Sequence, residues 1–363
     1  MKKIRVNLAD RSYNILIANN LFSDLAVSSE QFIKDKKVFV VTDSNVNPLY
    51  GKIIREALAK HAATVDFAEF PAGEPSKNLK TMEMLYTKAV ECGLNRSSVI
   101  VALGGGVVGD IAGFLAATYM RGIKFIQIPT TLLAMVDSSV GGKTGVDLPS
   151  GKNLVGAFWQ PEAVFIDPET LKTLPDREIR CGLAEVVKYG VIMDGEFFRY
   201  LEDHTSVLNR LDPVIMEEVI ARCCALKAEV VEADEKEESG RRAILNYGHT
   251  FAHAIEVVLG YENINHGEAV AVGMCMAASL AVADSMLDDA AELRQENLLR
   301  ALKLPCSAAG VKPSEIYAAM HKDKKNENGR IRFVLPSSIG DVSLVEDDFP
   351  KAEIMQAVRN CCD

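Results

Sequence analysis

Residues 99–110 read Val-Ile-Val-Ala-Leu-Gly-Gly-Gly-Val-Val-Gly-Asp, an apolar run followed by a glycine-rich turn. The apolar run 99–103 predicts a buried strand, and residues 111–118 predict a helix. A strand, a glycine turn and a helix together form a phosphate cradle, because the first amides of a helix lack partners within it. Gly104, Gly106 and Gly109 match the dinucleotide-binding spacing, which a tight turn without any ligand can also show.

Outward from this stretch, the first half alternates β-rich runs with amphipathic stretches. Leu79, Met82, Leu85 and Ala89 recur at helical spacing, so a crossover helix is expected between two parallel strands. This rhythm predicts a Rossmann-like α/β domain with a mostly parallel sheet, whose expected strands are 3–8, 13–17, 37–42, 64–70, 98–103 and 124–128.

After about residue 174 the pattern becomes helical, and the second domain is expected to be all-α. Its expected helices are 178–203, 212–234, 241–259, 267–284, 287–302 and 312–321. Leu174-Pro175-Asp176 can stop one element and start the next. The sequence therefore predicts domains 1–174 and 175–363.

Composition narrows the class of partner. The 363 residues are 48% hydrophobic and carry a formal net charge of −10, which argues against a nucleic-acid partner. We expect no membrane span, because no run of about eighteen apolar residues is present, and no signal peptide. The eight cysteines show no metal-ligand spacing. They are expected to be reduced thiols without thiol chemistry, in a cytoplasmic protein.

Residues 137–161 crowd glycines, prolines, charges and the only tryptophan into a segment that we expect to be irregular. Its glycines let backbone amides approach an anion. Lys143 and Lys152 add positive charge, and Asn153 adds a two-sided amide. The segment predicts a small anionic ligand. Asp43, at the end of the strand 37–42, either accepts hydrogen bonds from a ribose or caps a turn.

Histidines cluster in the second half, where three of the six fall between residues 249 and 266. His249 and His253 are four residues apart and share a helical face, a spacing compatible with a divalent metal. The protease motif His-Glu-x-x-His is absent, so a carboxylate from elsewhere is needed. Glu185, in an apolar helical stretch with Lys188 three residues on, is the candidate, although a paired structural glutamate is the alternative.

Several long motifs carry a resemblance that covers nearly the whole chain. Gly-Gly-Gly-Val-Val-Gly-Asp at 104–110, Tyr-Met-Arg-Gly at 119–122, the segment 137–161 and Asn-Tyr-Gly-His-Thr-Phe-Ala-His at 246–253 resemble the 3-dehydroquinate synthases. The resemblance implies a homodimer that uses NAD and zinc, or cobalt, on an anionic sugar acid phosphate. It would convert 3-deoxy-D-arabino-heptulosonate 7-phosphate to 3-dehydroquinate and phosphate, on the way to aromatic amino acids. The implied steps are transient oxidation by NAD, β-elimination, reduction and an intramolecular aldol closure.

The resemblance also assigns residues. The NAD site would comprise Asp43, Gly105, Gly106, Val107, Asp110, Thr130, Thr131 and Lys152, with Glu74 and Lys77 beside the adenosine half. Glu185, His249 and His266 would bind the metal. Catalytic roles would fall to Arg121, Lys143, Asn153, Lys188 and His253, the last beside the metal ligands or in a proton relay. Glu238 would be a proton relay as well, although the charge run in which it lies is more typical of a solvated helix end. The substrate would be bound by Asp137, Lys227, Arg242, Asn246 and Lys325.

Three other functions stay open at this point. One is another sugar phosphate cyclase, such as an amino-dehydroquinate or 2-deoxy-scyllo-inosose synthase, although Arg242 and Lys325 favour the seven-carbon acid. Another is a metal-dependent polyol dehydrogenase, which would release NADH, and the segment 137–161 argues against it. The third is a nucleotide-binding module without catalysis, which the metal residues and the many cations disfavour.

Overall fold

The computed structural model describes residues 1–260, 262–322, 331–346 and 349–362. They form two compact units, the first comprising Met1–Leu174 with Pro213–Lys236 and the second comprising Pro175–Asp212 with Glu237–Asp363. The predicted division of the chain and the observed one both place a boundary after Leu174. The segment Pro213–Lys236 differs, because the sequence analysis assigned it to the second domain and its contacts group it with the first unit.

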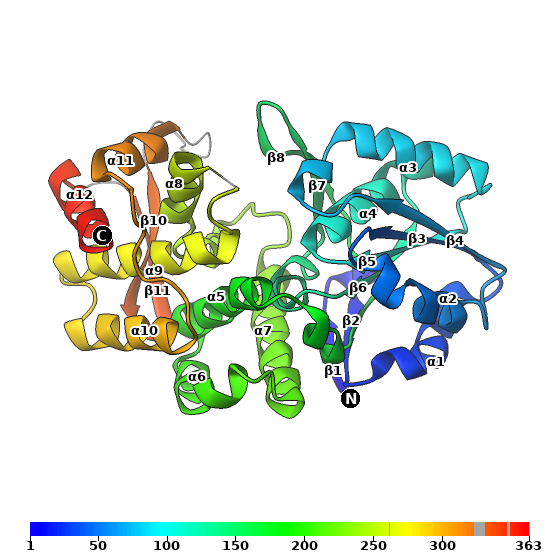
Figure 1. Ribbon diagram of the computed structural model, residues 1–363, viewed down its shortest axis with the longest axis horizontal. Helices are drawn as coiled ribbons and strands as arrows, with labels where there is room; N and C mark the ends of the chain where they lie inside the picture. Colours follow the sequence, from blue (N-terminus) through cyan, green and yellow to red (C-terminus); the bar gives the residue numbers. More distant parts are fainter. Residues whose placement is uncertain (261, 323–330, 347–348, 363) are drawn as a thin grey trace. The chain divides into compact units, whose positions relative to one another are not determined.

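The first unit is built on a seven-stranded sheet in the order β1-β2-β9-β6-β5-β3-β4 (Figure 1). Only the β1–β2 pair of this sheet is antiparallel, which confirms the mostly parallel sheet. Its strands are β1 (Lys2–Val6), β2 (Tyr13–Ile17), β3 (Lys37–Asp43), β4 (Thr64–Phe70), β5 (Val99–Gly104), β6 (Lys124–Pro129) and β9 (Ala163–Ile166).

Helices cover both faces of this sheet, which is why its central strand β5 is apolar and buried at every position. Phe39 and Val41 of β3 lie in a core with α3 and α4, whereas Val38 and Val40 lie in a second core with α1 and α2. This alternation is the two-residue period of a strand. The helices of this unit are α1 (Leu21–Ile33), α2 (Lys52–Leu58), α3 (Leu79–Glu91), α4 (Gly106–Thr118) and α7 (Pro213–Ala233).

The expectation that residues 137–161 lack regular structure is wrong. Most of the segment forms an antiparallel hairpin of β7 (Lys143–Leu148) and β8 (Gly151–Phe158). Gly145 pairs with Gly156, and a Cβ on Gly156 would lie 2.1 Å from the Thr144 carbonyl oxygen. The glycines that suggested a loop are therefore residues that the close strand pairing requires.

The second unit is mainly helical, as expected, with α9 at its centre among α5, α8, α10 and α12 (Figure 1). The expectation of an all-α domain missed the antiparallel pair of strands β10 (Arg332–Ser338) and β11 (Asp341–Glu346). The helices are α5 (Asp176–Met193), α6 (Gly195–Leu208), α8 (His249–Leu259), α9 (His266–Ala283), α10 (Asp289–Ala301), α11 (Pro313–Lys322) and α12 (Lys351–Asn360).

Close packing fixes α9 against α5 and against the start of α8. A Cβ on Gly267, the second residue of α9, would lie 2.3 Å from Cys181 Cα in α5, and one on Gly273 would lie 2.2 Å from the Gly248 carbonyl oxygen. Helix α9 is long and apolar enough to cross a membrane by length and composition, a possibility that the sequence analysis overlooked. Because 78% of that span is buried, it packs as a core helix.

Candidate cofactor and metal sites

Three neighbouring parallel strands of the first unit, β3, β5 and β6, end at one edge of the sheet. Thr42 of β3 pairs with Leu103 of β5, and Gly104 pairs with Pro129 of β6. Asp43 is the last residue of β3, and Gly105 and Thr130 directly follow β5 and β6. The predicted NAD residues thus converge where open α/β sheets bind their ligands.

At the end of β5 the glycine turn leads into α4 without a side-chain cap. A Cβ on Gly104 would lie 2.5 Å from Val108 Cγ2, and one on Gly106 would lie 3.1 Å from Ser138 Oγ, so this turn is too tight for larger residues. The first amides of α4 are available to an anion. Thr130 Oγ1 nearby is buried and has no hydrogen-bond partner among the described residues. This turn fits the pyrophosphate of a dinucleotide.

A polar network joins this turn to the hairpin. The Lys77 ammonium lies 2.5 Å from Asp110 Oδ2 and donates to Asn153 Oδ1 at 2.6 Å. Burial lowers the pKa of Lys77, but the Asp110 and Glu74 carboxylates more than offset this, so the pKa is raised and the charge is kept. Lys152 lies 3.7 Å from Glu74. Asn153, assigned to catalysis by the resemblance, therefore lies among the expected cofactor residues.

One residue of this network was missed by the sequence analysis. Asp147 Oδ1 accepts a hydrogen bond from the backbone N–H of Asn153 at 2.7 Å, and the Asp147 N–H donates to the Lys77 carbonyl at 2.8 Å. Asn153 has a left-handed backbone, with φ of 54°. Asp147 thus holds Asn153 in an unusual conformation. An aspartate within a glycine-rich hairpin gives no sequence signal for this role.

Two predicted cofactor residues also have local structural roles. Asp43 Oδ1 accepts from the N–H groups of Asn45 and Val46, each at 2.9 Å, so the turn-capping interpretation holds and leaves Oδ2 for a ribose. Thr131 Oγ1 accepts from the Ala134 N–H at 3.2 Å.

Candidate substrate residues also lie in the first unit. The Lys227 ammonium of α7 donates to the Asp137 carbonyl at 2.8 Å and to its Oδ1 at 2.9 Å, which brings two predicted substrate residues together. Arg121 is exposed with a left-handed φ of 67°, and Lys143 is exposed at the start of β7.

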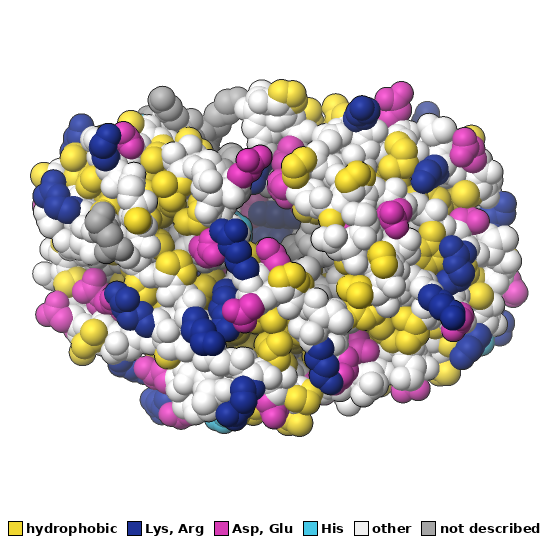
Figure 2. All heavy atoms as spheres, viewed as in Figure 1, with side chains coloured by type: hydrophobic (Ala, Val, Ile, Leu, Met, Phe, Trp, Pro, Cys, Tyr) yellow, Lys and Arg dark blue, Asp and Glu magenta, His cyan; other side chains and the backbone are white. Residues whose placement is uncertain are grey.

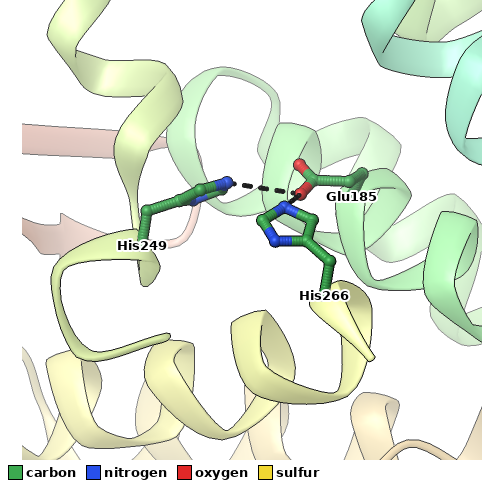
Figure 3. Close-up of side chains that lie close together, drawn as sticks. All are labelled: Glu185, His249 and His266. Carbon is green, nitrogen blue, oxygen red and sulfur yellow. Dashed lines mark ion pairs between the residues drawn. The ribbon is translucent and has the colours of Figure 1, made fainter. Parts of the chain in front are cut away.

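In the second unit, Glu185, His249 and His266 come together from three helices (Figure 3). Glu185 Oε1 lies 3.5 Å from Nε2 of each histidine, and one ligand atom from each residue falls within 4.8 Å of the others. His249 begins α8, His266 begins α9, and Glu185 is on α5. Two imidazoles and one carboxylate are a donor set typical of catalytic zinc.

In both histidines the second ring nitrogen, Nδ1, has a polar partner outside the cluster. His266 Nδ1 lies 3.2 Å from Glu256 Oε1, and His249 Nδ1 lies 3.0 Å from the Tyr247 carbonyl oxygen. Such contacts fix the tautomer and leave Nε2 for a metal. Glu256 received no role in the sequence analysis, although its position seven residues after His249 places it on the same helical face.

Lys188 forms an ion pair with Glu185, and both side chains are buried. Burial raises the pKa of Glu185, but the opposing effects of Lys188 and His249 are larger. The pKa of Glu185 therefore lies well below its usual range. Burial lowers the pKa of His249. Burial also lowers that of His266, but Glu185 and Glu256 raise it more, to about 9. The metal-free cluster therefore holds one carboxylate and one imidazolium at neutral pH.

Other predicted residues of the second unit lie nearby or elsewhere. The His253 ring centroid is 5.7 Å from that of His249. Arg242 is buried, with Nε 3.6 Å from Glu237 Oε1. Asn246 and Glu238 are exposed. Lys325 lies outside the described residues.

The charged side chains are mixed in sign on one face of the protein. On the face drawn in Figure 2, basic and acidic side chains are interspersed over each unit. A nucleic-acid-binding face would instead carry a cluster of basic side chains.

The fold and site define a class, namely synthases that join a nucleotide-binding type of sheet to a helical metal-binding unit. Two solved structures illustrate it. A 2-deoxy-scyllo-inosose synthase complexed with carbaglucose-6-phosphate, NAD⁺ and Co²⁺ is 30% identical, with a TM-score of 0.89 over 99% of this chain and 100% of that one. The 2-epi-5-epi-valiolone synthase of Streptomyces hygroscopicus subsp. jinggangensis, with NAD⁺ and Zn²⁺ bound, is 30% identical, with a TM-score of 0.88 over 98% of each chain.

Sequence similarity identifies the family. The family models for the 3-dehydroquinate synthase N-terminal and C-terminal parts match residues 67–181 and 182–326. The 3-dehydroquinate synthase of Desulforamulus reducens is 51% identical over 96% of this chain and 97% of its own length. The chain is an enzyme and belongs to the 3-dehydroquinate synthase family.

Proposed function

We propose that the protein converts 3-deoxy-D-arabino-heptulosonate 7-phosphate to 3-dehydroquinate and phosphate, as a phosphate-eliminating carbon–oxygen lyase. Membership of the family supports this reaction. The observation that carries the proposal is the cluster of Glu185, His249 and His266, because its donor set suits a metal that polarises hydroxyl groups.

The first unit would hold NAD and the second a zinc or cobalt ion. NAD would supply a transient hydride acceptor, and the metal would supply Lewis acidity toward a substrate hydroxyl. The uncapped start of α4 with Gly105, Gly106 and Val107 would bind the pyrophosphate, and Asp43 Oδ2 would accept from a ribose.

The remaining work falls to the protein's own charges. Lys188 keeps Glu185 ionised and, as a buried ammonium, can bind or protonate a substrate oxygen. Lys143, Lys227 and Arg242 would bind the carboxylate and phosphate of the substrate. Orientation and charge are then the protein's main contribution to catalysis.

The metal ligands can be tested by His249→Ala. We expect loss of bound metal together with turnover, because only two of three ligands remain. His204→Ala is the matched control, since His204 stacks on Tyr200 in α6 and is not a proposed ligand. Metal content by atomic emission and phosphate release are the measurements. Full metal and full turnover in His249→Ala would exclude the proposed triad.

Lys188→Ala separates chemistry from cofactor binding. NAD is assigned to the other unit, so its dissociation constant should be unchanged, whereas turnover should fall by about 100-fold or more as for loss of a general acid–base group. Calorimetric titration with NAD and a steady-state assay check both parts. Unchanged turnover would remove Lys188 from the catalytic residues.

Two further proposals concern the protein's setting. We place it in the cytoplasm, which is supported by the free state of its eight cysteines. We also expect a homodimer, which rests on the family resemblance and is tested by sedimentation equilibrium.

A further inference from the structure

The peptide group between Tyr247 and Gly248 carries the carbonyl oxygen that holds His249. His249 Nδ1 lies 3.0 Å from this oxygen, which can only accept, so Nδ1 is the protonated ring nitrogen. Tyr247 has an extended ψ of 127°, and Gly248 has a left-handed φ of 77°. These two angles set the direction of the carbonyl. The orientation of a proposed metal ligand therefore depends on whatever fixes this peptide group.

One side of the peptide group is fixed by close backbone packing against α9. A Cβ on Gly248 would lie 2.7 Å from Met274 Cγ and 2.9 Å from the Met274 nitrogen. A Cβ on Gly273 would lie 2.2 Å from the Gly248 carbonyl oxygen. Both positions require glycine, because a larger residue would force the two backbones apart.

The other side is fixed through the side chain of Tyr247 by a residue of α10 to which the sequence analysis gave no role. Tyr247 is fully buried, and its hydroxyl donates to Gln295 Oε1 at 2.7 Å. Gln295 is 2% exposed, and its Nε2 donates to the Met274 carbonyl at 3.1 Å. The hydroxyl also lies 3.2 Å from that carbonyl, but its single proton goes to the shorter contact. Gln295 thus ties Tyr247 to the same turn of α9 against which Gly248 packs.

We propose that Gln295 and the Tyr247 hydroxyl are positioning groups for the metal ligand His249, although neither belongs to the ligand cluster. Together with the glycine packing, they hold the Tyr247 carbonyl where it binds His249 Nδ1, so that Nε2 faces Glu185 (Figure 3). The proposal rests on the proposed function only in that the cluster binds a metal. Metal affinity would then depend on a glutamine of α10, a helix that supplies no ligand.

A purely structural role for the same two groups makes a different prediction. Removing one of two buried hydrogen-bonded groups leaves the other unsatisfied and destabilises the fold, whereas removing both can be nearly neutral. If Tyr247 and Gln295 only stabilise the fold, metal affinity should follow stability and recover when both groups are removed. If they position His249, metal affinity should stay weakened, because the anchor of the carbonyl is still missing.

The test compares Tyr247→Phe, Gln295→Met and the double variant with the unaltered full-length protein. Phenylalanine keeps the ring, and methionine has a similar length, so the substitutions remove hydrogen bonds with little change in volume. The Zn²⁺ dissociation constant is measured by competition with a chromogenic chelator. Stability is measured as the urea midpoint of the metal-free protein.

We expect Tyr247→Phe to bind Zn²⁺ about tenfold more weakly, as for loss of a group that supports a metal ligand. Gln295→Met should show a smaller loss, because the hydroxyl can turn to the Met274 carbonyl at 3.2 Å. The double variant should match Tyr247→Phe in Zn²⁺ affinity, since Gln295 acts on His249 only through Tyr247. Its urea midpoint should nevertheless lie above that of Tyr247→Phe.

A control and a spectrum separate positioning from loss of stability. Ser279→Ala is the matched control, because Ser279 is buried on α9 and accepts from Asn360 Nδ2 at 2.9 Å. It should lower the urea midpoint without changing Zn²⁺ affinity. Bound Co²⁺ reports its coordination geometry through visible absorption, so the Co²⁺ spectrum should change in Tyr247→Phe and not in Ser279→Ala.

Unchanged Zn²⁺ affinity in Tyr247→Phe would overturn the proposal, because the glycine packing alone would then hold the carbonyl. Recovery of Zn²⁺ affinity in the double variant would overturn it as well. If Tyr247→Phe does not fold, Gln295→Met decides, since its affinity must then fall below that of Ser279→Ala. These measurements need no substrate, so failure of the synthase reaction leaves them standing. Absence of Zn²⁺ binding by the unaltered protein would instead exclude the metal cluster and this proposal together.

Discussion

At the scale of single residues, the metal cluster depends on nitrogens that face away from it. Helical spacing alone paired His249 with His253, whereas the family resemblance named Glu185, His249 and His266, the three residues that the structure brings together. The contacts of Glu256 and the Tyr247 carbonyl could not be predicted, since they depend on how α8 and α9 meet. Side-chain identity suggests a ligand, and packing decides its tautomer.

Glu256→Gln should therefore weaken metal binding without removing a ligand. The substitution removes the charge that supports His266 Nδ1, and loss of such a partner typically costs about 10–100-fold in metal affinity. Competition with a chromogenic chelator measures the dissociation constant. Glu262→Gln is the control, because Glu262 is exposed in the following loop. Equal affinity in both variants would show that Glu256 does not support the ligand.

The pKa of His266 predicts how metal binding depends on pH. A metal must displace the proton held by this imidazole, whose pKa is raised to about 9 in the metal-free protein. Apparent affinity should therefore rise about tenfold per pH unit toward pH 9 and then level off. The same proton stabilises the metal-free fold below the unfolded pKa of about 6.5, and this stabilisation is lost as the pH rises through about 9.

Proton release is the direct measurement for this prediction. Calorimetric titration with zinc at pH 7, in two buffers of different ionisation enthalpy, should give about one proton released per metal. A value near zero would mean that His266 is already neutral.

At the level of helices and strands, six of the seven strands of the large sheet followed from the sequence pattern, whereas β9 and the hairpin β7–β8 did not. The expected helix 178–203 is two helices, α5 and α6, because Asp194 ends the first and caps the second. Gly145 and Gly156 weaken strand propensity, and their need for close backbone approach appears only when the strands are paired. The hairpin then becomes the support for Asn153 and Lys152.

Asp147→Ala tests that support. Loss of the Asp147 hydrogen bond should free the backbone of Asn153 and loosen its contact with Lys77, so NAD should bind roughly tenfold more weakly, as expected for a hydrogen bond to a charged group. Metal content should not change, because the metal residues lie in the other unit. Ser150→Ala, at the exposed tip of the same hairpin, is the control. Unchanged NAD affinity, measured by calorimetry, would separate Asp147 from the cofactor site.

At the scale of the whole molecule, the chain leaves the first unit at Leu174 and returns to it with Pro213–Lys236. The boundary itself has a proline signal, but the return has none, because α7 resembles the helices around it in composition. Its place is fixed by contacts with β1, β2 and the segment Ala134–Ser138, which also bring Lys227 to Asp137. Local periodicity cannot reveal such long-range pairing.

The proposed reaction uses NAD and a metal on a single protein and involves no net oxidation. The most direct measurement is phosphate release from 3-deoxy-D-arabino-heptulosonate 7-phosphate with catalytic NAD and zinc, with and without a chelator, while absorbance at the NADH band is followed. We predict chelator-sensitive phosphate release with no accumulation of NADH. Steady NADH production from polyols without phosphate release would contradict the synthase reaction and indicate a dehydrogenase.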